Sequence, residues 1–130
     1  MTQLLRTLIV DDEEDRRDIL EMMLTRIGVE VKLASNGKEA IELLKKEEID
    51  LVISDISMPI MDGVTLLTEL RNLTISQPHF IFISGGIEFD ENKKKLIESQ
   101  TDGVISKPFQ AEQILDCFSR IFPSRNFNKI

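Results

Sequence analysis

The chain has 130 residues, 42% hydrophobic and 30% charged, which suits one globular domain with a sizeable core and is too short for two. Its net charge of −7 argues against direct binding to nucleic acid, because phosphate contacts need clustered Lys and Arg. We expect no secretion signal, no membrane span and, with a single cysteine, no internal disulfide, so a cytoplasmic location is the default.

The first part of the chain alternates between strand and helix patterns. Residues 8–10 form a short apolar run, which is typical of a strand covered on both faces. Apolar residues with helical spacing follow over 19–27, and Gly28 stands where a helix C-cap belongs. Apolar and charged residues then alternate over 29–33, which predicts a half-exposed edge strand.

The same alternation continues to the end of the chain. Asn36, with Glu39 three positions on, indicates a variant capping box that starts a helix. Further strands and helices are predicted, in chain order, at residues 51–53 (strand), 64–70 (helix), 80–83 (strand), 90–99 (helix, with few apolar anchors), 104–105 (strand) and 114–122 (helix).

This pattern is a strand–helix unit repeated five times, which predicts a single α/β domain with a doubly wound parallel sheet. Right-handed crossovers favour the flavodoxin-like strand order 2-1-3-4-5, with the alternating second strand at an edge. We assign residues 1–122 to this domain and expect 123–130 to be a short, frayed C-terminal tail.

Polar residues follow the predicted strands at their carboxyl ends. Asp11 and Asp12 follow the first strand, Asp55 the third, Ser84 the fourth and Lys107 the fifth. Carboxyl ends of parallel strands share one edge of a sheet, and open α/β sheets bind ligands where the strand order reverses. Each residue alone has an ordinary explanation as a helix cap, a strand-end hydroxyl or a surface lysine, but together they should converge in one cleft.

Three carboxylates and one lysine would leave this cleft with an excess negative charge that destabilises the fold unless a cation compensates it. The candidate ligands are all oxygens, which favours Mg²⁺, an ion that accepts few protein ligands and keeps several waters. A carboxylate can act as a nucleophile and form an aspartyl-phosphate, so Asp55 is the predicted phosphoryl acceptor. Lys107 would supply positive charge and Ser84 a hydrogen bond to the phosphoryl group.

Four short motifs occur in order and together resemble the response-regulator receiver domain, the CheY-like, phosphorylated half of two-component signalling. The resemblance spans Thr7 to about Phe122, and its motifs are residues 10–13, 55–63, 82–85 and 107–109. The second motif holds the loop residues Pro59, Asp62 and Gly63, and the fourth holds Pro108; seen alone, all are turn formers.

The resemblance implies specific roles and partners. Asp12, Asp55 and the backbone carbonyl of Ser57 would bind Mg²⁺, with Asp11 acting mainly through water. Asp55 would accept phosphate from a histidine kinase or a histidine phosphotransfer protein, and the Lys107–Pro108 peptide bond would be cis. The chain would catalyse only its own phosphorylation and dephosphorylation, and would regulate an unidentified partner protein as a monomer or weak dimer.

Val104 departs from the family pattern, because receiver domains often carry Tyr or Phe at the corresponding position, three residues before the lysine. Ser84 also replaces the more frequent Thr. The usual inward turn of an aromatic ring is therefore not available, and we expect the signal to pass through residues 85–88 and the following helix.

Three other functions fit the sequence less well. An unphosphorylated, receiver-like interaction scaffold normally lacks part of the acidic cleft or the lysine, and nothing is missing here. A Mg²⁺-dependent phosphatase often has a second Asp two residues after its nucleophile, where this chain has Ser57. A flavin-binding protein needs a hydroxyl-rich phosphate loop that the sequence lacks.

Overall fold

The structure is a computed structural model that describes residues 4–85 and 91–128. Five strands and five helices alternate along this part of the chain, as the sequence predicts. The strands are β1 (Arg6–Val10), β2 (Glu30–Ala34), β3 (Leu51–Asp55), β4 (His79–Ser84) and β5 (Gly103–Ser106). The helices are α1 (Glu14–Ile27), α2 (Gly37–Lys46), α3 (Gly63–Arg71), α4 (Glu91–Gln100) and α5 (Ala111–Ile121).

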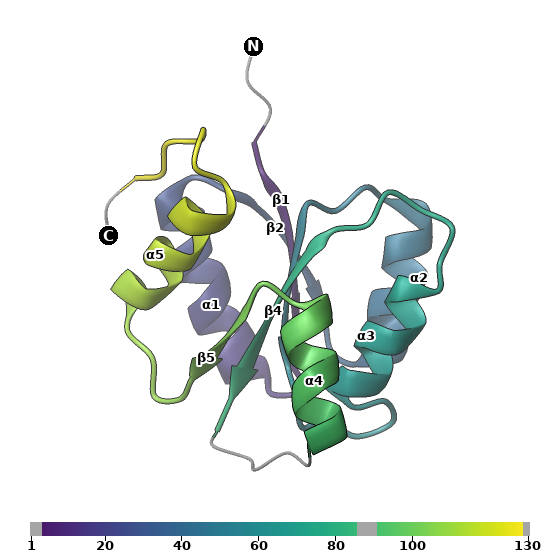
Figure 1. The fold of residues 1–130 in the computed structure, drawn as a ribbon. Helices are drawn as coiled ribbons and strands as arrows, with labels where there is room; N and C mark the ends of the chain where they lie inside the picture. Colours follow the sequence, from purple (N-terminus) through teal and green to yellow (C-terminus); the bar gives the residue numbers. More distant parts are fainter. Residues whose placement is uncertain (1–3, 86–90, 129–130) are drawn as a thin grey trace.

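The five strands form one parallel sheet in the order β2-β1-β3-β4-β5, which confirms the predicted topology. Helices α1 and α5 cover one face of the sheet, and α2, α3 and α4 lie on the other (Figure 1). All strands run in the same direction, so their carboxyl ends meet at a single edge, the lower one in Figure 1.

The sheet divides the core into two parts. Leu8 and Val52 point into the cluster beneath α2 and α3, whereas Ile9 and Ile53 point into the cluster beneath α1 and α5. Every residue of β3 is buried. Both faces of the central strands are thus covered, which explains why their sequences are continuously apolar instead of alternating.

Strand β2 lies at the edge, as predicted, but its exposure does not alternate as the sequence suggests. Val31, Lys32 and Leu33 are all half-buried. The ammonium group of Lys32 lies 3.7 Å from a carboxylate oxygen of Glu47, just beyond α2. The aliphatic stem of a lysine can cover apolar surface while its charged end stays in water, which accounts for the difference.

Two helix ends follow the sequence signals. Gly28 ends α1 in the left-handed conformation, with φ 94°, which glycine adopts at little cost. The Asn36 side chain accepts a 2.8 Å hydrogen bond from the backbone N–H of Glu39 and caps α2. The Glu39 carboxylate accepts from the backbone and hydroxyl of Ser35, not from the backbone of Asn36, so the reciprocal half of the capping box is displaced by one residue.

The described residues 123–128, expected to be a frayed tail, contact the domain. The ring of Phe127 packs edge-on against Phe118, with ring centroids 5.5 Å apart. The backbone N–H of Asn128 donates to the carbonyl of Ile27 at 3.0 Å. One aromatic anchor and one backbone hydrogen bond therefore hold this segment against α5 and the end of α1.

Two further predictions concern the region around α4. Gly86 and the rest of the proposed signalling loop up to residue 88 lie outside the described residues. Within α4, Ile97 is the buried residue, in line with the few apolar anchors of its sequence.

Across the described parts of the chain, no helix has the length and apolar character needed to cross a bilayer.

Candidate functional site

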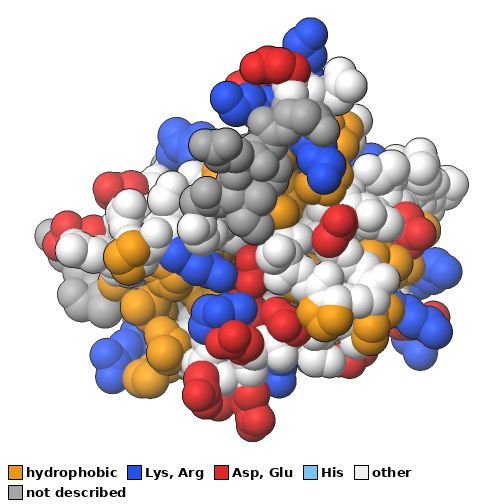
Figure 2. Space-filling model, turned by 90° about the horizontal axis from the view of Figure 1, so that it is seen from below, with side chains coloured by type: hydrophobic (Ala, Val, Ile, Leu, Met, Phe, Trp, Pro, Cys, Tyr) orange, Lys and Arg blue, Asp and Glu red, His pale blue; other side chains and the backbone are white. Residues whose placement is uncertain are grey.

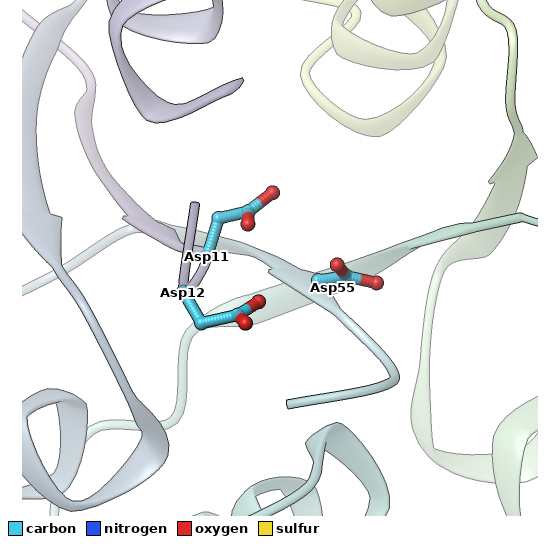
Figure 3. A group of neighbouring side chains, drawn as sticks. All are labelled: Asp11, Asp12 and Asp55. Atoms are coloured by element: carbon cyan, nitrogen blue, oxygen red, sulfur yellow. The ribbon is translucent and has the colours of Figure 1, made fainter. Parts of the chain in front are cut away.

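Three carboxylates meet at the edge where β1 and β3 end. Asp11 and Asp12 follow β1, and Asp55 is the last residue of β3; the two strands are adjacent, with Val10 opposite Ser54. One oxygen atom from each carboxylate lies within 4.8 Å of the others, and Figure 3 shows the three side chains grouped between the strand ends. Asp11 and Asp55 are 3% and 5% exposed, while Asp12 is exposed.

Lys107 reaches this group from the end of β5. Its Nζ atom donates a 3.2 Å hydrogen bond to Oδ2 of Asp55, across 52 residues of sequence. Its backbone N–H donates to the carbonyl of Ser84 at 2.7 Å, which ties the ends of β4 and β5 together. The following peptide bond, Lys107–Pro108, is cis, as the family resemblance implies.

Ser84 stands beside the site at the end of β4. It is buried and lies one residue beyond Ile83, the register partner of Asp55. The predicted convergence of Asp11, Asp12, Asp55, Ser84 and Lys107 at one edge of the sheet is therefore confirmed.

The loop after β3 returns closely to the strand. The backbone N–H of Gly63 donates to the carbonyl of Ile56 at 2.7 Å, and a Cβ atom at Gly63 would lie 2.5 Å from the carbonyl oxygen of Asp55. Only glycine fits this approach. Asp62 caps α3 by accepting a 2.8 Å hydrogen bond from the backbone N–H of Thr65, so its carboxylate serves the helix.

Most of the remaining loop positions named from the sequence are open to solvent. Ser57, Pro59 and Pro108 are exposed, whereas Met58 is buried and anchors the loop to the core. Ile60 has φ 72°, an uncommon conformation for a β-branched residue, and its side chain is 79% exposed. On β5, Val104 is 43% exposed.

Arg16 is the site residue that the sequence reasoning missed. It lies in the first turns of α1, and its guanidinium group faces the three carboxylates. Its Nε and Nη2 atoms donate to the two oxygens of Asp11 at 3.0 and 3.1 Å, and Nη2 also donates to Oδ2 of Asp55 at 3.1 Å. The same Nη2 lies 3.7 Å from Oδ1 of Asp12. The available signal was the four-residue spacing between Asp12, which lies just before α1, and Arg16 in the first turn of that helix, because residues so spaced can meet at a helix start.

The electrostatics of Arg16 follow from this geometry. Hydrogen bonding to Asp11 raises the pKa of the Arg16 guanidinium above its ordinary value, and this outweighs burial, which lowers it. The side chain therefore remains a cation. Lys107 and Arg16 both contact Oδ2 of Asp55.

The charge and ligand set fit a hard divalent cation. Four carboxylates, the three of the cluster and that of Glu13, lie beside three cations: Arg16, Lys107 and Arg17, which donates to the backbone carbonyl of Asp11 at 2.7 Å. An excess of negative charge remains at this edge. Figure 2 shows acidic and basic side chains side by side near the middle of the face that it presents. All potential ligands in the cluster are oxygens, as Mg²⁺ prefers, and receiver domains bind Mg²⁺ at such an aspartate cluster.

Comparisons with known proteins agree with this geometry. The response regulator receiver domain family matches residues 7–119. The chemotaxis protein CheY of Halobacterium salinarum is 35% identical over 116 residues, covering 89% of this chain and 95% of that protein. The sensor histidine kinase RcsC of Escherichia coli K12 is 35% identical over 107 residues, 82% of this chain but only 11% of the kinase.

Solved structures give the same result. The receiver domain of the Francisella response regulator 1452 superimposes with a TM-score of 0.80 at 26% identity, covering 92% of this chain and 98% of that one. The chemotaxis protein CheY4 of Vibrio cholerae has a TM-score of 0.79 at 29% identity, with 91% and 98% covered. The chain thus belongs to the response regulator receiver domain family and is a receiver domain of two-component signalling.

Proposed function

We propose that Asp55 accepts a phosphoryl group from a phosphohistidine on a histidine kinase or a histidine phosphotransfer protein. The observation that carries this proposal is the environment of the Asp55 carboxylate. It is buried at the end of β3, lies beside two other carboxylates and accepts hydrogen bonds from Lys107 and Arg16. Concentrated positive charge beside a carboxylate nucleophile is what phosphoryl transfer requires.

In the proposed step, an Asp55 carboxylate oxygen attacks phosphorus and forms an O–P bond. The N–P bond of the phosphohistidine breaks, and the imidazole nitrogen keeps the electron pair and takes up a proton. Lys107 offsets the charge on the phosphoryl oxygens, and Ser84, at the neighbouring strand end, donates a hydrogen bond to one of them.

Asp12, Asp55 and the backbone carbonyl of Ser57 would hold Mg²⁺, with Asp11 acting mainly through water. The bound ion supplies the additional positive charge that lets the carboxylate approach the phosphoryl group. The oxygen-only cluster supports this assignment.

The output is proposed to be regulation of a partner protein in the cytoplasm by a monomer or weak dimer, without direct contact to nucleic acid or membrane. Val104 provides no ring that could turn inward, so the proposed route of the signal is residues 85–88, which follow β4 in sequence, and α4. An unphosphorylated interaction scaffold is the alternative, and the complete set of acidic and basic residues disfavours it.

The test is incubation with Mg²⁺ and a small acyl phosphate, followed by intact mass measurement. Wild type should gain one phosphoryl group, and Asp55→Asn should gain none. Asp50→Asn, the same change at the opposite edge of the sheet, should react like wild type. An adduct that persists in Asp55→Asn, or that never forms on wild type, would show that Asp55 is not the acceptor.

A further inference from the structure

We infer that Arg16 is an intramolecular counter-cation that competes with Mg²⁺ for the acidic cluster and thereby sets the Mg²⁺ concentration that phosphorylation requires. This inference deepens the proposed function and rests on it. It concerns a residue of this chain that the family resemblance did not assign to the site.

One guanidinium nitrogen of Arg16 lies close to all three carboxylates. Nη2 of Arg16 lies 3.1 Å from an oxygen of Asp11, 3.1 Å from one of Asp55 and 3.7 Å from one of Asp12. These are the three carboxylates whose oxygens lie within 4.8 Å of one another. A divalent ion held by the same carboxylates would have this nitrogen as an immediate like-charged neighbour, so each cation raises the free energy of the other's binding.

The strongest contact of Arg16 is with a buried partner. Its Nε and Nη2 atoms bind Asp11 in the two-pronged geometry typical of arginine, and the Asp11 side chain is 4% exposed. A bidentate ion pair with a buried carboxylate is held more firmly than a surface pair. This contact holds the guanidinium group beside the oxygens of Asp12 and Asp55 that Mg²⁺ would bind.

Arg16 also has an acidic partner outside the cluster. Its third nitrogen, Nη1, lies 3.0 Å from the carboxylate of Glu13, which is exposed. The Arg16 side chain itself is partly exposed. The guanidinium group can therefore turn toward Glu13 and solvent without losing every partner, which makes it a competitor and not a permanent block.

The experiment measures Mg²⁺ affinity by isothermal titration calorimetry on the full chain. Arg16→Gln should bind Mg²⁺ about 5- to 10-fold more tightly than wild type, the lower part of the usual range for coupled binding. Arg26→Gln is the matched control, because Arg26 is an exposed arginine in the last turn of the same helix. It removes the same charge far from the cluster and should change the affinity less than 2-fold, on the scale of screened surface charges.

Thermal unfolding provides a second readout that does not depend on phosphorylation. In EDTA, Arg16→Gln should melt below Arg26→Gln, because three carboxylates lose a cation; saturating Mg²⁺ should close or reverse this difference. Arg16→Lys keeps the charge with a single nitrogen, should fold in EDTA, and should give an affinity between those of wild type and Arg16→Gln.

Two results would overturn the inference. In one, Arg16→Gln binds Mg²⁺ no more tightly than Arg26→Gln. In the other, it binds more weakly, which would make Arg16 a partner of the ion. Failure of the proposed function looks different: none of the proteins would take a phosphoryl group on Asp55, whatever their Mg²⁺ affinities.

Discussion

At the amino-terminal edge of the sheet, two carboxylates each tie the start of one strand to its neighbour. Asp50 precedes β3 and accepts a 2.7 Å hydrogen bond from the backbone N–H of Arg6 in β1, together with weaker contacts from the Arg6 side chain. Asp102 precedes β5 and accepts from the backbone N–H of Phe80 in β4 at 2.9 Å, and from the His79 ring at 3.1 Å.

At the carboxyl-terminal edge, Asp11, Asp12 and Asp55 gather in one cluster and share Arg16, with Lys107 added at Asp55. At the first edge the described carboxylates are spread out: Arg6 contacts Glu48 and Asp50, and Asp102 binds separately at the start of β4. At the second edge, three carboxylates converge, with oxygens within 4.8 Å of one another. The contrast teaches that ion pairs alone do not mark a site, whereas unbalanced convergence does.

The largest expected effect concerns how tightly the backbone packs at Gly63, on the carboxyl-terminal edge. Gly63→Ala should lower the free energy of unfolding by about 2–4 kcal/mol, because the new methyl group overlaps the carbonyl of Asp55 and the ring of Phe82. Urea denaturation followed by circular dichroism measures this. Gly85→Ala is the control, since a Cβ atom there meets nothing within 4 Å in the described structure; an equal loss in both variants would refute the steric explanation.

The second-largest expected effect is stabilisation by Mg²⁺, which should depend on the carboxylates of the carboxyl-terminal edge alone. Saturating Mg²⁺ should raise the free energy of unfolding by about 1–3 kcal/mol in wild type, because it binds the native cluster and not the unfolded chain. The increment should disappear in Asp12→Asn and persist in Asp50→Asn. Urea titrations with Mg²⁺ and with EDTA give the free energy of unfolding with and without the ion. Loss of the increment in Asp50→Asn would contradict the proposal that only the carboxyl-terminal edge binds Mg²⁺.

Removing a carboxylate from the amino-terminal edge should cost stability alone. Asp102→Ala leaves the partly buried N–H of Phe80 without its acceptor and should lower the free energy of unfolding by about 1–2 kcal/mol. Mg²⁺ affinity and acyl-phosphate labelling should stay as in wild type. A large drop in labelling of the folded variant would mean that this edge also contributes to the reaction.

The smallest effect should come from the exposed loop beside the site. Ile60→Asn should raise the free energy of unfolding by about 0.5–1 kcal/mol, because asparagine tolerates a positive φ better than a β-branched residue does. Ile19→Asn, at an exposed position within α1, should instead be neutral or slightly destabilising. Equal shifts in both variants would argue against a conformational origin.

The sequence predicted all five strands, the strand order and the convergence of five polar residues, because continuous apolar runs and strand-end polar residues are local signals. The Arg16 contacts were not predictable in the same way. A separation of four residues relates Arg16 to Asp12, but the contact with Asp55 spans 39 residues and depends on how α1 packs against the sheet.

The tail and the edge strand show the same limit. Phe127 is a single aromatic residue in a polar segment, and only the tertiary structure brings it against Phe118. The sequence pattern predicts an outward-facing charge at Lys32, but the residue is half-buried and its ammonium group lies near Glu47. Local patterns identify elements, whereas partners distant in sequence decide how much of each residue is buried.

The most direct test of the central claim is to locate the phosphoryl group on the chain. After labelling with acyl phosphate and Mg²⁺, borohydride reduction converts an aspartyl-phosphate to homoserine, and peptide mass spectrometry identifies its position. Our account predicts homoserine at position 55 of the wild-type chain and none at Asp11, Asp12 or Asp50. Homoserine at one of those other positions, or phosphate on a hydroxyl or histidine side chain, would contradict it.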